Sequence, residues 1–277
     1  MTRPPLSKDT TVCISLAGRS SNIGTRFHNH LYDVLGLDFL YKAFTTTDIV
    51  AAIGGVRALG IRGCSVSMPF KEDVLALVDD VEPSAQAIES VNTIVNDLSV
   101  PGGRLTASNT DYLAVQQLIA QYELNPADPV VIRGSGGMAK AVGAAFTGAG
   151  FTTGCVAARN RDTGEALADR LGYTYVADVD TVTAPILVNV TPIGMTGAPE
   201  EHELAFGEAA IAAAGTVFDV VALPSETPLI KAARAAGTQV ITGAQVIALQ
   251  AAEQFERYTG VRPTPEQITE ASERSRA

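Results

Sequence analysis

A glycine-rich turn near the middle of the chain has the residue types and spacing to hold a phosphate. The β-branched run Val130-Val131-Ile132 leads through Arg133 into Gly134-Ser135-Gly136-Gly137, and a helical pattern follows over 138–146. A strand, a G-x-G-x-x-A turn and a helix make up the dinucleotide fingerprint. The amides and the positive dipole end of such a helix favour a bound phosphate. We therefore predict a nucleotide site formed by Gly134, Ser135, Gly136, Gly137 and Ala139, with a tight turn lacking any ligand as the alternative.

Two charged residues outside this turn, Lys71 and Asp111, have the chemistry of an acid and a base. Lys71 follows a predicted strand over 61–67, and the sites of α/β proteins lie just past such carboxyl ends. Asp111 stands at a predicted helix start, where the helix dipole favours a carboxylate. Taken alone, these positions favour a solvated lysine and a carboxylate at a helix start over a catalytic role.

The histidines and cysteines give no metal-binding pattern. His28 and His30 lie on a predicted helix, where packing or surface roles are expected, and the third histidine, His202, is remote. The three cysteines are far apart in apolar, strand-like surroundings, which predicts buried reduced thiols. They are Cys13, Cys64 and Cys155. We predict no metal site.

The first third of the chain alternates strand and helix patterns. Strands are expected over 11–16, 39–44 and 61–67, with helices over 25–35 and 48–59, the second capped from Thr47. This βαβαβ order predicts a parallel sheet. Short helices after Lys71 and around 85–88, a hairpin of 92–96 with 104–107, and a helix over 112–122 complete the region.

The second region continues from the glycine turn as a doubly wound pattern. Strands are expected over 153–158, 173–176, 186–190, 217–221 and 239–242, with helices over 163–171 and 228–236. A last helix over 244–258 is expected to return to the first domain, and residues 271–277 to fray. We predict a two-domain α/β protein. An N-terminal substrate domain, 1–111 joined by 244–277, is accompanied by a Rossmann-type dinucleotide-binding domain over 112–243.

The amino-acid composition argues against nucleic acid and anionic membranes as binding partners. The 277 residues are 46% hydrophobic and 18% charged, with a net charge of -10, which fits a folded protein that nucleic acid and anionic membranes would repel. No run reaches the roughly 18 apolar residues of a membrane helix, and the start lacks the apolar core of a signal peptide. We expect a cytoplasmic protein whose partner is a small-molecule substrate or another protein, and an oligomer is possible.

Six short motifs, in their order along the chain, resemble those of the shikimate dehydrogenase family. Ser65-Val66-Ser67-Met68-Pro69-Phe70-Lys71 resembles the family's N-V-T-x-P-x-K, Ser90-Val91-Asn92-Thr93 its A-V-N-T, and Asn109-Thr110-Asp111 its N-T-D. The turn 134–137 is similar to its nucleotide turn, 189–195 to its N-x-T-x-x-G-M, and 250–252 to its Q-A-A. The resemblance covers nearly the whole chain.

This resemblance implies reversible reduction of a ring ketone by a nicotinamide, with Lys71 and Asp111 as the catalytic pair. An ammonium held by a carboxylate can stabilise the negative charge that hydride transfer leaves on oxygen, and can deliver the proton. By the same resemblance, Asn92 and Gln250 hydrogen-bond substrate hydroxyls, and Ser67 takes the place of a threonine in that role. Thr191, in the fifth motif, is assigned to the cofactor.

The chain departs from the family where the substrate carboxylate binds. Aligned on His28-Asn29, the family's S-x-S becomes Asn22-Ile23-Gly24, so both hydroxyls are missing. The family's active-site tyrosine after D-x-x is replaced by Ala222. Both changes resemble the divergent shikimate dehydrogenase-like subgroup, and the missing hydroxyls predict that shikimate is a poor substrate. Three nearby polar residues could compensate, although a polar turn explains them equally well: Arg19, Ser20 and Ser21.

The expected cofactor is NADP. After the second Rossmann strand, where an acidic residue would mark NAD, the chain has Arg159-Asn160-Arg161. Arg159 aligns with the arginine of the family's N-R-T and is predicted to clamp the 2′-phosphate with help from its two neighbours, although surface arginines are the simpler reading. The predicted function is an NADP-dependent dehydrogenase of the shikimate type, in aromatic amino acid biosynthesis. The alternatives are a quinate or other polyol-acid dehydrogenase, and a nucleotide-sensing protein without turnover, which would not need Lys71 and Asp111.

Overall fold

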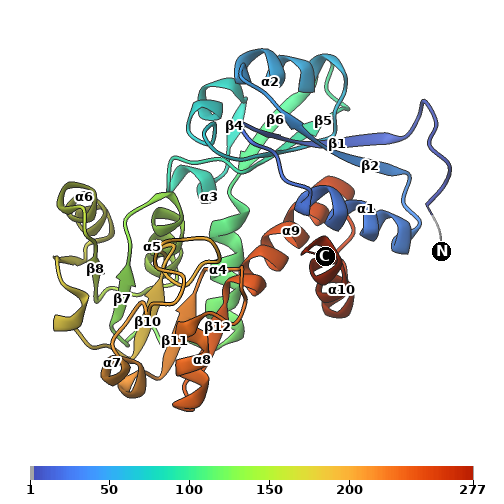
Figure 1. Ribbon diagram of the computed structural model, residues 1–277. Coiled ribbons are helices and arrows are strands. Elements are labelled where there is room, and N and C mark those ends of the chain that lie inside the picture. The colour runs from blue at the N-terminus through green and yellow to red at the C-terminus, as the bar shows by residue number, and fades with distance from the viewer. Residues whose placement is uncertain (1–2, 277) are drawn as a thin grey trace. The chain divides into compact units, whose positions relative to one another are not determined.

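Two six-stranded sheets form the framework of the chain (Figure 1). The computed structural model describes residues 3–276. The chain divides into unit 1, Met1–Thr110 with Ala248–Ala277, and unit 2, Asp111–Ile247. Each unit contains one of the sheets, and each is described separately below.

The sheet of unit 1 is mixed. Its order is β2-β1-β3-β5-β6-β4, and β1 runs parallel to both β2 and β3. The hairpin of β5 and β6 then reverses direction, so β5 is antiparallel to β3. The expected parallel sheet therefore holds for the first three strands only. The strands are β1 (Thr11–Ala17), β2 (Phe39–Thr45), β3 (Gly63–Val66), β4 (Asp80–Val81), β5 (Thr93–Asp97) and β6 (Arg104–Ser108).

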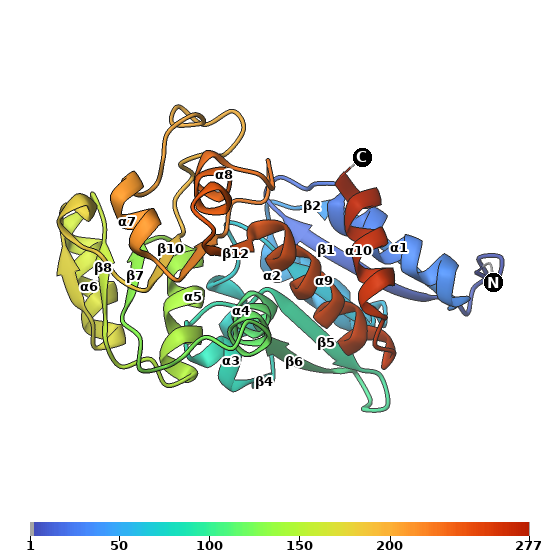
Figure 2. The same ribbon diagram turned by 90° about the horizontal axis from the view of Figure 1, so that it is seen from below.

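Helices cover both faces of this sheet because each face carries buried apolar side chains. One face packs against α1 (Ile23–Leu35), the Ala248–Thr259 part of α9 (Gly243–Thr259) and α10 (Pro265–Arg276), which lie side by side in Figure 2. The other face packs against α2 (Ile49–Ala58). The 3-10 helix η1 (Asp73–Leu77) and the short α3 (Pro83–Gln86) lie between β3 and β5 in the sequence.

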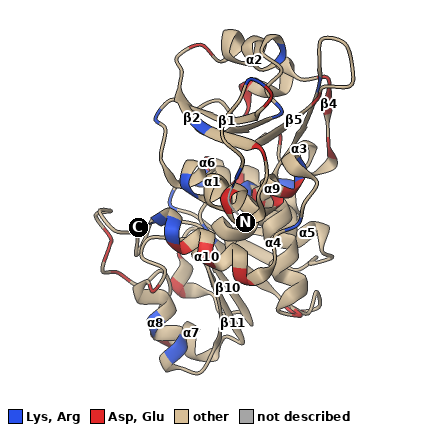
Figure 3. Cartoon of the chain, turned by 90° about the vertical axis from the view of Figure 1, so that its right-hand side faces the viewer, with Lys and Arg blue, Asp and Glu red and all other residues tan. Residues whose placement is uncertain are grey.

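Two expectations for unit 1 are wrong. The N-cap of α2 is Asp48 instead of Thr47, because the Asp48 carboxylate accepts a hydrogen bond of 2.9 Å from the Ala51 amide. Residues 271–276 do not fray, since they complete α10, where Ala271 and Ser275 are buried. The last residue of the predicted tail, Ala277, lies outside the described residues. Helix α10 carries both acidic and basic residues (Figure 3). Because so many of its residues are charged, its buried stripe is hard to recognise in the sequence.

The sheet of unit 2 is entirely parallel, with the order β12-β11-β10-β7-β8-β9. Counted from β7, this is the doubly wound order 3-2-1-4-5-6, and its direction reverses between β7 and β10. A crevice outside the carboxyl ends of the strands at this reversal is where such sheets bind ligands. The strands are β7 (Val130–Arg133), β8 (Gly154–Ala157), β9 (Thr174–Val176), β10 (Ile186–Asn189), β11 (Thr216–Asp219) and β12 (Gln239–Thr242).

Five helices and one 3-10 turn connect and cover these strands. They are α4 (Thr110–Gln121), α5 (Gly137–Gly148), α6 (Arg161–Leu171), α7 (Glu208–Ala213), α8 (Pro228–Ala235) and η2 (Val179–Thr181). Val130, Val131 and Ile132 of β7 are all buried, as a strand covered on both faces requires. Within residues 3–276, no helix has the length and apolar character to cross a membrane.

Candidate nucleotide and substrate sites

The glycine turn of unit 2 joins β7 to α5 and fits a pyrophosphate. Gly134 has φ +122°, and a side chain there would meet Cγ2 of Val190 at 2.9 Å, so only glycine suits this position. Gly136 is the N-cap of α5 and Gly137 its first residue. A Cβ added at either would meet nothing within 4 Å. The backbone at the helix start is therefore open to an anion, whereas Ala139 is buried against the sheet.

A cavity of about 660 Å³ lies beside this turn, entirely within unit 2. It is bordered by the carboxyl ends of β7, β8, β9 and β10, where the strand order reverses. Its lining comes from 133–136, 157–160, 177–180 and 190–193, with Leu204, Phe206 and Gly207. Of the predicted cofactor residues, six line the cavity and two, Gly137 and Ala139, do not. The six are Gly134, Ser135, Gly136, Arg159, Asn160 and Thr191.

The polar residues after β8 differ in their side-chain hydrogen-bond partners. Asn160 caps α6, because its Oδ1 accepts from the Thr163 amide at 3.1 Å. Ser135 and Thr163 share a hydroxyl hydrogen bond of 2.8 Å, which joins the glycine turn to the same helix. Arg161 pairs with Glu165 at 2.8 Å. The Arg159 side chain is 80% exposed and borders the cavity, although its Nη1 also lies 3.1 Å from Oε1 of Glu200.

A buried polar network holds the end of β10 against β11. Thr191 donates through its hydroxyl to Oδ1 of Asn189 at 2.6 Å, and the Asn189 amide donates to Asp219 at 3.0 Å. Asp219 also accepts from the Thr227 hydroxyl at 2.6 Å and from the Val221 amide at 3.0 Å. Burial raises the pKa of Asp219 to about 6 against these hydrogen bonds. Thr191 is thus oriented by a network anchored on Asp219.

Sequence reasoning missed Arg133 as a cavity residue. Its half-buried guanidinium donates to the carbonyl oxygen of Ala205, which lies 72 positions away. Burial lowers the pKa of Arg133, and the nearby Asp180 opposes that shift. A lone arginine ending the apolar run 130–132 is the signal that could have drawn attention to it.

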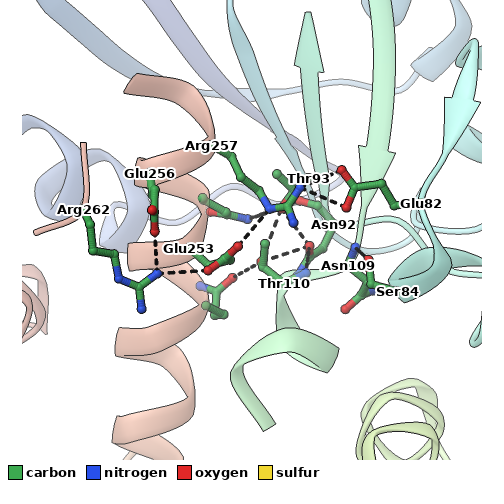
Figure 4. Close-up of polar contacts among 12 residues, drawn as sticks. Glu82, Ser84, Asn92, Thr93, Asn109, Thr110, Glu253, Glu256, Arg257 and Arg262 are labelled. Carbon is green, nitrogen blue, oxygen red and sulfur yellow. Dashed lines mark hydrogen bonds and ion pairs between the residues drawn. The ribbon is translucent and has the colours of Figure 1, made fainter. Parts of the chain in front are cut away.

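In unit 1, the side-chain amide of Asn92 is fixed by three donors from the start of α4 and the start of β5. Its Oδ1 accepts from the Thr110 amide at 2.8 Å, from the Thr110 hydroxyl at 3.1 Å and from the Thr93 hydroxyl at 2.8 Å (Figure 4). Because a backbone N–H only donates, the carboxamide oxygen must face Thr110. The Thr110 hydroxyl also lies 3.3 Å from Oε1 of Gln250, which brings two predicted substrate residues into one cluster.

Gln254 is a second residue that sequence reasoning missed. It is buried on α9, and its Nε2 donates to the Thr93 hydroxyl at 2.9 Å, which in turn donates to Asn92. One turn along, Arg257 reaches Glu82 at 2.8 Å, and this ion pair also anchors α9 (Figure 4). Gln254 follows Gln250 by four residues, so the two share a helix face, which is the signal that could have found it.

The segment carrying Ser67 and Lys71 lies next to this cluster. The Ser67 amide donates to the carbonyl of Leu16 at 2.9 Å, and the carbonyl of Lys71 accepts from the Val91 amide at 2.8 Å. Lys71 is therefore held by its backbone beside the residue that precedes Asn92. Asp111 lies in the first turn of α4 and belongs to unit 2. Its pairing with Lys71 stays a prediction.

The segment before α1 has the polar residues that were expected to replace the missing hydroxyls. Arg19 and Ser21 are exposed, and Ser20 accepts a hydrogen bond of 3.1 Å from Thr45. Asn22 is the N-cap of α1 but makes no side-chain capping bond. A Cβ at Gly24 would lie 3.4 Å from the ring of Tyr41, an ordinary packing distance.

The packing role expected for His28 is confirmed. It is fully buried, stacks on Tyr41 with ring centroids 4.3 Å apart, and lies beside Phe255 at 6.0 Å. Burial lowers its pKa to about 3. His30 lies 3.6 Å from Glu270 on α10. The three cysteines are free and buried, as predicted. Among residues 3–276, no three His, Cys, Asp or Glu side chains are grouped to hold a metal ion.

Comparison with known proteins agrees with this geometry. Residues 21–94 match the family model described as the shikimate dehydrogenase substrate binding domain. The chain is 58% identical to the shikimate dehydrogenase-like protein of Haemophilus influenzae over 96% of this chain and 97% of the relative. A solved shikimate 5-dehydrogenase-like structure superposes with a TM-score of 0.96 at 57% identity, covering 99% of this chain and all of that one.

A more distant structure extends the comparison to a ligand complex. Shikimate 5-dehydrogenase of Thermus thermophilus, solved with NADP(H) and shikimate, has a TM-score of 0.83 and 29% identity, with 96% of this chain and 99% of that chain covered. The doubly wound sheet of unit 2 is the Rossmann-type fold that the sequence predicted. With the whole-length identity to the Haemophilus influenzae relative, these matches establish that the chain belongs to the shikimate dehydrogenase family.

Proposed function

We propose that this protein is an NADP-dependent dehydrogenase that interconverts a secondary alcohol and a ketone on a hydroxylated cyclic acid related to shikimate. The observation that carries the proposal is the cavity of unit 2, where an open glycine turn after β7 and Arg159 after β8 border the same space. The turn suits a pyrophosphate, and a guanidinium suits a 2′-phosphate. NADP supplies the hydride donor or acceptor when it is bound.

The cofactor is tested by measuring the dissociation constants of NADP and NAD side by side. A hydrogen bond to a charged group contributes about 1.5 to 3 kcal/mol, so we expect NADP to bind about ten- to a hundredfold more tightly. Arg159→Gln should remove this preference and leave NAD binding in place. Equal affinities for the two dinucleotides in the unmodified protein would contradict the assignment.

In unit 1, Asn92 and Gln250 are proposed to hold the hydroxyls of the substrate. Since Oδ1 of Asn92 already serves three donors, its Nδ2 is the group that can serve a substrate oxygen. The Thr110 hydroxyl has one proton and faces oxygens of both Asn92 and Gln250, so it can satisfy only one of them. This leaves Oε1 of Gln250 able to accept from a ligand hydroxyl, and Ser67 is proposed to assist.

Lys71 is proposed as the catalytic acid, with Asp111 as its partner. Reduction of the ketone leaves negative charge on its oxygen, which the Lys71 ammonium stabilises and then protonates. In the reverse direction, the neutral amine removes the hydroxyl proton. The backbone bond from Val91 to Lys71 supports this role because it places the lysine segment beside Asn92.

We further propose that shikimate itself is a poor substrate. The family's two carboxylate-binding hydroxyls are absent at Asn22 and Gly24, and losing two hydrogen bonds to a charged group costs about 3 to 6 kcal/mol, or two to four orders of magnitude in kcat/KM. Arg19 could offset part of this loss by holding a carboxylate with two parallel bonds.

A turnover screen against shikimate, quinate and related cyclic alcohols, with NADP and NAD, tests the substrate. A kcat/KM with shikimate above about 10⁴ per molar per second would refute the poor-substrate proposal. Tight NADP binding without turnover on any compound would favour a nucleotide-sensing protein instead.

A further inference from the structure

An acidic residue already contacts the guanidinium assigned to the 2′-phosphate. In unit 2, Nη1 of Arg159 lies 3.1 Å from Oε1 of Glu200. The Arg159 side chain is 80% exposed, whereas that of Glu200 is only 22% exposed. The exposed arginine side chain therefore turns onto a largely buried carboxylate.

The backbone of Glu200 is held by hydrogen bonds within the segment that follows β10. The Gly194 amide donates to the carbonyl of Glu200 at 3.0 Å, and the Glu203 amide donates to it at 3.1 Å. Further along, Arg133 of β7 donates to the carbonyl of Ala205, whose neighbours in sequence line the cavity. Glu200 thus stands on a hydrogen-bonded segment, and its carboxylate contacts Arg159, which lines the nucleotide cavity.

We propose that Glu200 is a specificity-determining residue that competes with the 2′-phosphate of NADP for Arg159, an inference that rests on the proposed function. A carboxylate at this position repels a phosphate dianion, yet it can accept a hydrogen bond from the free 2′-hydroxyl of NAD. Arg159 thus strengthens NADP binding, and Glu200 weakens it. The protein therefore discriminates between the two dinucleotides less strongly than Arg159 alone would allow.

The expected size of the effect follows from the exposure of the pair. Breaking an exposed ion pair weakens binding by up to about fivefold in the dissociation constant, so losing the Arg159–Glu200 pair should strengthen NADP binding by up to that factor. Removing the repulsion between the Glu200 carboxylate and the phosphate adds a similar or smaller factor. Glu200→Gln should therefore tighten NADP binding about three- to tenfold, and NAD binding should change less than about twofold. The gain should shrink at high salt, because exposed charges are screened over about 10 Å at 0.1 M ionic strength.

The experiment is calorimetric titration of the full-length protein with NADP and with NAD. The variants are Glu200→Gln, Arg159→Gln and the double variant. Glu201→Gln is the matched control, because the Glu201 carboxylate accepts from the Gly197 amide at 2.9 Å within the same segment. The control should leave both dissociation constants unchanged. In the Arg159→Gln background, Glu200→Gln should bring no gain in NADP binding beyond about twofold, since the group that it competes for is gone.

The outcomes separate this inference from the cofactor proposal. If the unmodified protein prefers NADP and Arg159→Gln removes the preference, while Glu200→Gln changes nothing, only the role of Glu200 is overturned. If the unmodified protein shows no preference but Glu200→Gln creates one, the role of Glu200 stands and the NADP assignment fails for the native chain. An equal gain for NADP and NAD, or a gain that persists without Arg159, overturns the competition.

Discussion

Replacing His28 by Phe should remove an acid-sensitive contribution to the stability of unit 1. The imidazole is fully buried among aromatic rings, and burial lowers its pKa from 6.5 to about 3. Between these two values the unfolded chain binds a proton that the folded chain does not, so the free energy of unfolding falls as the pH falls. Each pH unit costs about 1.4 kcal/mol, which gives about 2 kcal/mol at pH 5 relative to pH 7.

Asp219 of unit 2 changes the free energy of unfolding with pH in the opposite direction, so its contribution must be separated from that of His28. Its folded pKa is raised to about 6, so its contribution to stability is present at low pH and is lost as the pH rises through that value. Between pH 7 and pH 5 it should stabilise unit 2 by roughly 1 kcal/mol. Asp219 is present in both proteins, so its contribution cancels when the free energy of unfolding of the unmodified protein is compared with that of the His28→Phe variant.

The assay is urea unfolding at pH 7, 6 and 5, followed by circular dichroism because the chain contains no tryptophan. The unmodified protein should lose about 2 kcal/mol more than His28→Phe between pH 7 and pH 5. The exposed His202→Gln is the control and should behave like the unmodified protein. NMR titration of the His28 ring should find it neutral down to about pH 4. Equal acid sensitivity in both proteins, or a ring that titrates near pH 6.5, would refute the reasoning.

Three further experiments test the catalytic pair, the carboxylate site and the core. Lys71→Ala should lower turnover on the best substrate by about 10² to 10⁴ without changing NADP binding, and adding Asp111→Asn should cost little more if the two act as a unit. Near-normal turnover would exclude the role. Asn22→Ser with Gly24→Ser should raise kcat/KM for shikimate at least about tenfold, and no gain would mean that another group binds the carboxylate. Gly63→Ala should lower the free energy of unfolding by about 1 to 3 kcal/mol in urea melts.

The reason for the last effect is the close approach of β3 to α9. A Cβ at Gly63 would overlap the ring of Tyr258, which is fully buried and cannot move away. Gly54→Ala is the matched control, because a Cβ at that position in α2 would meet nothing within 4 Å. Alanine there should be neutral or stabilising by up to about 1 kcal/mol. Similar losses in both variants would show that the contact with Tyr258 does not matter.

Most of the fold could be predicted because its signals are local. Apolar strands bounded by glycine and proline, such as 130–133, are recognisable from a few consecutive residues. The helix α10 was missed because its sequence, Pro265–Arg276, is dominated by charged and polar residues, and only packing against α1 and the sheet reveals its buried stripe. The two-residue strand β4 is too short to carry any pattern.

The same contrast between local sequence signals and packing of distant elements applies to the candidate sites. The glycine turn and Arg159 are recognisable from neighbouring residues, so they could be predicted. The bond from Gln254 to Thr93 spans 161 positions, and the pair of Arg159 with Glu200 spans 41. Contacts of this kind depend on how distant elements pack, and no local pattern in one sequence specifies them.

The division of unit 1 between the two ends of the chain has a consequence for synthesis on the ribosome. Unit 2 is one continuous stretch, so all of its strands are available once residue 247 has emerged. The first 110 residues must wait, because one face of their sheet is covered by side chains such as Phe255 and Ile268. Until those arrive, the apolar cluster of Phe27, Leu31 and Tyr41 lacks the side chains of α9 and α10, so the nascent chain exposes apolar surface that favours aggregation.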